Sequence, residues 1–204
     1  MHLKLEGLYK GRLIYDFKVE NYERKGQKAS VSAEMLSKIK HLIADLRSNV
    51  GALRREARQA LVFIGKPVVD LLIPLLEDPD DDVRWEVTKA LAEIADPKAA
   101  SGLVGLLMDH YFGVRWLAAE ALIPIGRDAL KPLLEKLTEH PESSWLRRGA
   151  LHVLHHLAKK VPDLKEMVGP VITALEGFEP EIGCLGPAYP ALGKLRGSFD
   201  PLLV

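Results

Sequence analysis

Three histidines gather in the segment "LHVLHHL", and their spacing is the first pattern in this sequence that could support chemistry. His152 and His156 are four residues apart, so on a helix they share one face and could chelate a transition metal. No carboxylate stands nearby at ligand spacing, and the HExxH pattern of helical zinc sites is absent. We therefore expect His152, His155 and His156 to form a polar outer helix face, with no metal site.

The remaining reactive side chains form no catalytic constellation. Cys184 is the only cysteine, so neither an intramolecular disulfide nor a cysteine-based zinc site can form. The acidic run 80–82 lacks the loop length and the downstream Glu of a calcium site, and it is better explained as helix capping. No Gly-rich phosphate loop and no Ser-centred elbow is present. The sequence thus predicts a chain that is not an enzyme and has no cofactor.

The charge balance restricts the partners. The 204 residues include 28 Lys or Arg and 28 Asp or Glu, whereas nucleic-acid binding depends on neutralising phosphates with excess basic residues. Charged or polar residues interrupt every short apolar run, so we expect no signal-like start and no membrane-spanning stretch. A cytoplasmic protein is expected, with a protein partner of unknown identity and with no nucleic acid and no membrane.

A motif recurs along the chain at spacings of 30 to 32 residues. Its clearest copies are "VRWEVTKALAEIA" (83–95) and "VRWLAAEALIPIG" (114–126), and matching copies start at Leu53 and Leu146. Counted from the first residue of each copy, small or apolar residues stand at offsets 0, 4, 7, 8 and 11, which lie on one face of a helix. A second apolar helix follows each copy. The pattern predicts two-helix repeats that stack into an array.

The array is predicted to cover residues 30–204 in about five units, with atypical ends. Residues 1–29 differ from the repeats, because they alternate apolar and polar side chains, and they are expected to form a β-hairpin or an extended arm. The predicted units are a half-repeat at 32–47, complete units at 50–78, 80–109, 112–140 and 144–177, and a degenerate cap at 180–204.

These units resemble HEAT-like repeats of the type named after phycobilisome lyases, over roughly residues 32–204. The resemblance implies an all-α fold, a right-handed α-solenoid of two helix layers in which the second helices line a concave surface. It also implies that the arginine at offset 1 of each unit has a structural role and meets the acidic turns between repeats. These arginines are Arg54, Arg84, Arg115 and Arg147.

Enzymes with similar repeats differ at the positions that carry their chemistry. Deoxyhypusine hydroxylase has His-Glu pairs at offsets 2 and 3 that bind iron, but no histidine stands there in this chain. Bilin lyases share the repeats, yet nothing here points to a tetrapyrrole, and the repeat-type DNA glycosylases have a basic groove. We therefore expect a non-catalytic protein-binding scaffold or adaptor. The alternative is an accessory subunit that holds a substrate protein or cofactor for a lyase or modifying enzyme.

Offset 2 of each unit points away from the apolar stripe of its own helix, because it lies about 175° around the helix from the centre of that stripe. Trp85 and Trp116 occupy this offset in the two middle units, and Arg55 and Arg148 occupy it in the outer two. These four side chains are predicted to form an outward ladder, extended by Ile123.

The ladder and the concave side are both candidate partner surfaces. For the ladder, simple packing of each indole on the neighbouring repeat and self-association into a homodimer stay open as alternatives. The concave candidate lies near five residues of the second helices: Asp70, Ile73, Ser101, Lys131 and Glu135.

Overall fold

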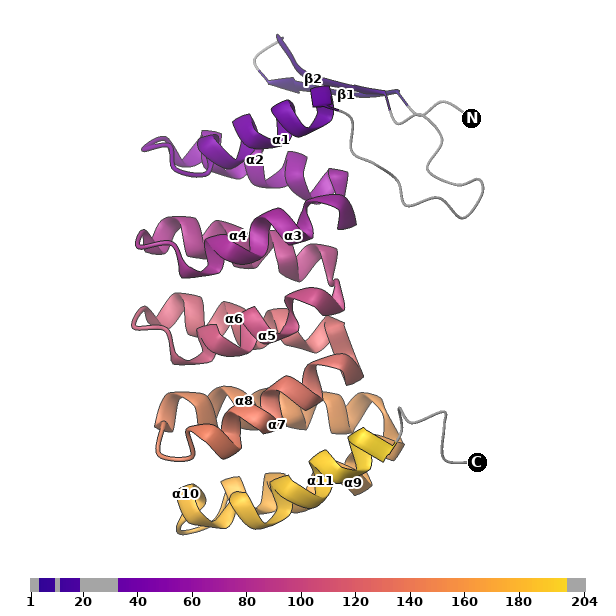
Figure 1. Cartoon of the computed structure of the whole chain (residues 1–204). Coiled ribbons are helices and arrows are strands. Elements are labelled where there is room, and N and C mark those ends of the chain that lie inside the picture. Colours follow the sequence, from indigo (N-terminus) through magenta and orange to yellow (C-terminus); the bar gives the residue numbers. More distant parts are fainter. Residues whose placement is uncertain (1–3, 10–11, 19–32, 198–204) are drawn as a thin grey trace. The chain divides into compact units, whose positions relative to one another are not determined.

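The computed structural model of the chain describes residues 4–9, 12–18 and 33–197 (Figure 1). It divides into two compact units, residues 1–36 and 37–204. In the first unit, β1 (Lys4–Tyr9) and β2 (Arg12–Lys18) pair antiparallel, with an irregularity in the register after Gly7. A hairpin is one of the two structures predicted for this segment.

From residue 33 onward the described chain is helical, and short 3-10 turns join many of the helices. In the units at 50–78, 80–109 and 112–140 the first helix has 14 residues, and the second helix is shorter and adjoins 3-10 turns. In chain order the elements are α1 (Ala33–Asp45), α2 (Gly51–Ile64), η1 (Lys66–Val68), α3 (Val69–Leu72), η2 (Ile73–Glu77), α4 (Asp81–Ile94), η3 (Pro97–Ala99), α5 (Ala100–Gly105), η4 (Leu106–Met108), α6 (Phe112–Ile125), η5 (Gly126–Ala129), α7 (Leu130–Glu139), α8 (Ser144–Lys160), α9 (Pro162–Leu175), α10 (Pro180–Gly183) and α11 (Leu185–Gly197).

The long helices form one layer, in which α2 packs on α4, α4 on α6 and α6 on α8 (Figure 1). The offsets predicted to be apolar point into the core, and small side chains at several of them let neighbouring helices approach closely. In α4 these buried side chains are Val83, Val87, Ala90 and Leu91, and in α6 they are Val114, Ala118, Ala121, Leu122 and Ile125. The predicted stack of two-helix repeats is thereby confirmed.

Caps and prolines set where these helices begin and end. The side chain of Asp80 accepts a hydrogen bond from the backbone N–H of Asp82 and so caps α4. At its other end α4 stops at Ala95, which has a left-handed φ of 52°. Helix α3 ends at Leu72, directly before the 3-10 turn that contains Pro74, because proline lacks the N–H that an α-helix requires and its ring clashes with the preceding turn.

The C-terminal end of the stack departs from the regular order. We expected the apolar segment 168–175 to be the second helix of the unit 144–177 and to line the concave surface. Instead α9 packs mainly against α8, and α11 is the helix that packs against α7. Only Val161 separates α8 from α9, so the chain turns back at once and α9 stays beside α8. The place beside α7 is thus filled by the predicted cap.

No single helix among the described residues is long and apolar enough to cross a membrane. The pair 51–64 and 66–77 meets that criterion together by length and composition, with a bend of 112° between its members.

Candidate functional site

Four arginines, one in each complete repeat, close the turn that precedes their own helix. Each guanidinium donates from Nη1 to the backbone carbonyl six residues earlier in the chain, so it satisfies an oxygen that the turn leaves without a helical partner. The pairs are Arg54 with Ser48 at 2.8 Å, Arg84 with Asp78 at 2.7 Å, Arg115 with Asp109 at 2.6 Å, and Arg147 with Pro141.

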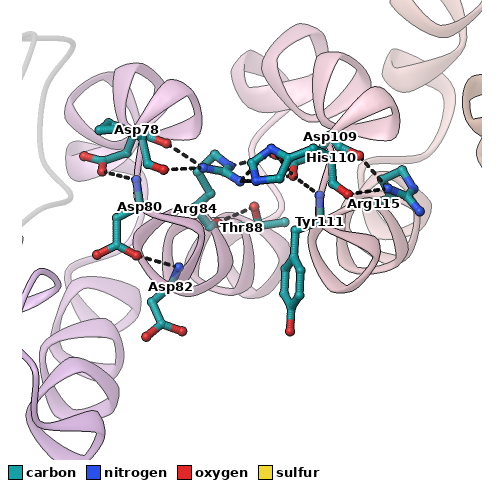
Figure 2. Close-up of polar contacts among 10 residues, drawn as sticks. Asp78, Asp80, Asp82, Arg84, Thr88, Asp109, His110, Tyr111 and Arg115 are labelled. Carbon is teal, nitrogen blue, oxygen red and sulfur yellow. Dashed lines mark hydrogen bonds and ion pairs between the residues drawn. The ribbon is translucent and has the colours of Figure 1, made fainter.

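Three of these guanidinium groups also reach a carboxylate farther along the chain. Arg84 holds Asp109 with two bonds, Nε to Oδ2 at 2.7 Å and Nη2 to Oδ1 at 3.1 Å (Figure 2). Both side chains are nearly buried, with 6% and 5% of their surface exposed, so this is the most desolvated of the three pairs. The other two carboxylates are Asp82, at 2.8 Å from Arg54, and Glu181, at 3.5 Å from Arg147.

Arg115 has an aromatic neighbour in place of a carboxylate. Among the described residues no acidic side chain lies within ion-pair distance of it. Its guanidinium carbon lies 4.2 Å from the centre of the Trp145 ring and 5.6 Å from that of Phe112, which are cation–π distances. Trp145 stands one residue before the first position of its copy of the motif, the place that Asp82 takes two copies earlier.

The two tryptophans of the predicted ladder have different surroundings. An ideal Cβ on Gly113 would come within 2.8 Å of the Trp85 ring, so the first turn of α6 lies directly against this indole. Trp85 is consequently partly buried, with Lys89 Nζ 5.5 Å from its ring centre. Trp116 is 51% exposed, and its ring centre lies 4.9 Å from that of His152.

Trp116 belongs to a cleft of about 230 Å³ between α6 and α8, which we call the tryptophan cleft. The cleft brings together two of the five predicted partner-binding residues, Trp116 and Arg148. It does not include Trp85 or Arg55, and Ile123 is buried, with 8% of its surface exposed. The lining residues are Leu107, Phe112, Arg115, Trp116, Ala119, Trp145, Arg148, Gly149 and His152.

The histidine cluster has a carboxylate partner that sequence reasoning missed. His152 Nε2 lies 2.6 Å from Glu120 Oε1, and the His152 and His156 rings are 4.4 Å apart. Glu120 is 32 residues earlier, at offset 6 of its own repeat, and His152 is at offset 6 of the next. Comparing equal offsets in neighbouring repeats could have found this pair. His155 contacts Glu176 instead, and no group of three possible metal ligands occurs among the described residues.

A second surface follows the second helices. A groove of about 650 Å³ runs along η2, α5, η4 and α7, and it contains three of the residues predicted for the concave side, Ile73, Ser101 and Glu135. A cavity of about 380 Å³ between α7 and α11 shares Glu135 and Glu139 with it and adds Tyr189. We call this continuous surface the second-helix groove.

The other two residues predicted for the concave side do not line the second-helix groove. Asp70 pairs with Lys98 at 2.7 Å, and this hydrogen bond raises the pKa of Lys98. Lys131 is exposed.

Cys184 is buried, and burial raises the pKa of its thiol, so little reactive thiolate is present near neutral pH.

Comparison with known proteins supports a HEAT-like repeat protein. A family model described as HEAT repeats matches residues 39–123. No curated protein matches the chain. Together with the observed stack of helices, the family match supports an α-solenoid of HEAT-like repeats.

Solved structures of designed repeat proteins are also similar. One is the crystal structure of an engineered protein, 22% identical over 80% of this chain and 84% of that one, with a TM-score of 0.38. Another is a designed armadillo repeat protein in complex with the peptide (KR)4, 20% identical over 78% of this chain and 86% of that one, with a TM-score of 0.40.

Proposed function

We propose that this chain is a non-catalytic scaffold that binds an extended segment of a partner protein in the second-helix groove. The observation that carries the proposal is the continuity of the groove from η2 to α11, with Glu135 and Glu139 common to both of its parts. Repeat proteins present such extended surfaces because each unit adds one more stretch of the same face. A groove that crosses several units suits an extended chain better than a compact small molecule.

We also propose that the repeats are HEAT-like repeats of the phycobilisome-lyase type and that the protein is cytoplasmic. The motifs at 83–95 and 114–126 support HEAT-like repeats of the phycobilisome-lyase type, and a sequence with a single cysteine is compatible with the reducing cytoplasm. If the native protein purifies with one enzyme in fixed stoichiometry, the accessory-subunit alternative is favoured instead.

The proposal is tested by selecting a phage-displayed library of random peptides against the immobilised full-length protein. Gly105 lines the groove, and a Cβ there would meet nothing within 4 Å, so Gly105→Trp should obstruct the groove without disturbing the core. We expect a class of the selected peptides to bind this variant at least about tenfold more weakly by fluorescence anisotropy, equivalent to about 1.4 kcal/mol.

The matched control is Gly186→Trp in α11, because a Cβ at Gly186 also meets nothing within 4 Å and Gly186 lines neither part of the groove. This variant should bind the same peptides as the wild type does. A selection that enriches no peptide, or only peptides that still bind Gly105→Trp, would contradict the proposal.

A further inference from the structure

We propose that the tryptophan cleft is a second docking site, which takes an apolar side chain flanked by carboxylates from an acidic segment of a protein partner. The site lies between first helices and is lined by none of the residues of the second-helix groove. The inference therefore goes beyond the proposed function in both place and chemistry.

The walls of the cleft are aromatic and open to solvent. Trp116 and Trp145 are 51% and 45% exposed, and Phe112 is 67% exposed at the same site. Half-exposed tryptophans beside a concavity are the kind of residue that contributes most to protein binding. Leu107 and Ala119, both buried, extend the apolar lining. An apolar group that enters the cleft would therefore be shielded from water by apolar surface.

The size of the cleft limits its occupant. Its volume of about 230 Å³ is below the range of about 300–1,000 Å³ that is typical of small-molecule and cofactor sites. A single side chain of a protein segment matches this volume better than a whole cofactor.

The charge at the cleft selects an acidic segment. Arg148 is exposed and makes no hydrogen bond or ion pair in the described part of the chain, and Arg115 has only carbonyl and aromatic neighbours there. Glu120 contacts the lining at His152 and is already hydrogen-bonded to it. Two arginines without carboxylate partners give a positive rim, and complementary carboxylates would be attracted to it.

A nucleic-acid strand fits these observations less well. Binding along a phosphate backbone needs a continuous row of cations, and the adjacent repeat offers carboxylates in the same layer, among them Glu86 and Glu93, both paired with Arg58. The formal net charge of the whole chain is also zero. The positive rim of the cleft is thus followed by carboxylates in the adjacent repeat.

The experiment sorts the peptides selected on the wild-type full-length protein by composition and measures binding of the class that has Phe, Leu or Trp between Asp or Glu residues. Arg148→Glu should weaken these peptides at least about tenfold, and Trp116→Ala about 30-fold. The matched control is Arg55→Glu, because Arg55 has the same offset in its repeat and is likewise exposed, but lies outside the cleft. Neither Arg55→Glu nor Gly105→Trp should weaken the binding of these acidic–apolar peptides.

The proposal is overturned if no acidic–apolar class is enriched, or if that class binds Arg148→Glu as tightly as the wild type. It is also overturned if Arg55→Glu weakens binding as much as Arg148→Glu does, since bulk charge would then explain the effect. Tight binding of a single-stranded oligonucleotide that Arg148→Glu abolishes would assign the cleft to nucleic acid.

Arg148→Glu changes an exposed side chain without a partner, so it keeps the test valid even if Trp116→Ala fails to fold. Because Gly105→Trp reports on the groove alone, either proposal can fail while the other holds.

Discussion

The junctions of α4 with α6 and of α6 with α8 begin from the same motif and end in different surfaces. At the first junction the helix that follows offers Gly113, and Trp85 packs against it. At the second, Trp145 stands at the equivalent position, and Trp116 lines an open cleft with it. The two junctions thus differ at one position in the first turn of the next helix, Gly113 or Trp145, and in whether the repeated tryptophan is partly buried or exposed.

The largest expected difference between the junctions concerns their arginines. Arg84→Ala should lower the free energy of unfolding by about 3–5 kcal/mol, because it leaves the nearly buried carboxylate of Asp109 without its only arginine among the described residues. Arg115→Ala removes hydrogen bonds to two carbonyls but no ion pair, so about 1 kcal/mol is expected. Urea unfolding followed by circular dichroism measures both variants, and equal losses would mean that the junctions are not different in this respect.

The tryptophans give the next largest difference. Trp85→Ala removes a side chain that the next helix covers, and a loss of about 2–3 kcal/mol is expected, somewhat below the range for fully buried tryptophans. Trp116→Ala removes a side chain that is half exposed, and about 1 kcal/mol is expected. Thermal unfolding with sedimentation analysis checks stability and self-association together. A larger loss at Trp116 would reverse the comparison.

A methyl group at Gly113 tests the contact itself. Gly113→Ala places Cβ 2.8 Å from the Trp85 ring, so the indole must move, and a net destabilisation of about 1 kcal/mol is expected. The control, Gly105→Ala, meets nothing within 4 Å and should stabilise its helix by about 0.5–1 kcal/mol through the unfolded state. If both variants are stabilised, as measured by urea unfolding, Trp85 does not depend on the glycine.

The smallest effect is spectroscopic. Because the chain has only three tryptophans, double Trp→Phe variants leave a single reporter, either Trp85 or Trp116. Acrylamide should quench the fluorescence of Trp116 more strongly than that of Trp85, since half of the Trp116 surface is open to solvent. Equal quenching constants would show that the two environments are alike in solution.

The sequence predicted the repeats well, because a helix face repeats its apolar offsets whatever its neighbours are. Val83, Val87 and Leu91 are buried as expected. The outward ladder was harder to predict, because the offsets within one helix give no information about which residues the first turn of the next helix places beside it. Ile123 points away from the stripe of its own helix and is nevertheless buried, since α6 has neighbours on both sides in the middle of the stack. The pair of His152 with Glu120 likewise depends on residues in different repeats.

The order of the C-terminal helices could not be derived from periodicity. Residues 162–175 have the apolar pattern of a second helix, and the pattern alone does not say which layer the helix joins. The single-residue connection after α8 was the relevant signal, because so short a link keeps α9 beside the helix it follows.

The guanidinium contacts also have a consequence for how the array opens. The ion pair is nearly buried at Arg84 and absent at Arg115 among the described residues, and at Arg147 it is long and its carboxylate is half exposed. From Arg84 towards the C-terminus these contacts therefore become weaker, and in a quasi-one-dimensional array the weaker contacts mark where partial unfolding begins. The amides of α9 and α11 should therefore exchange with solvent through openings that leave α4 and α6 closed.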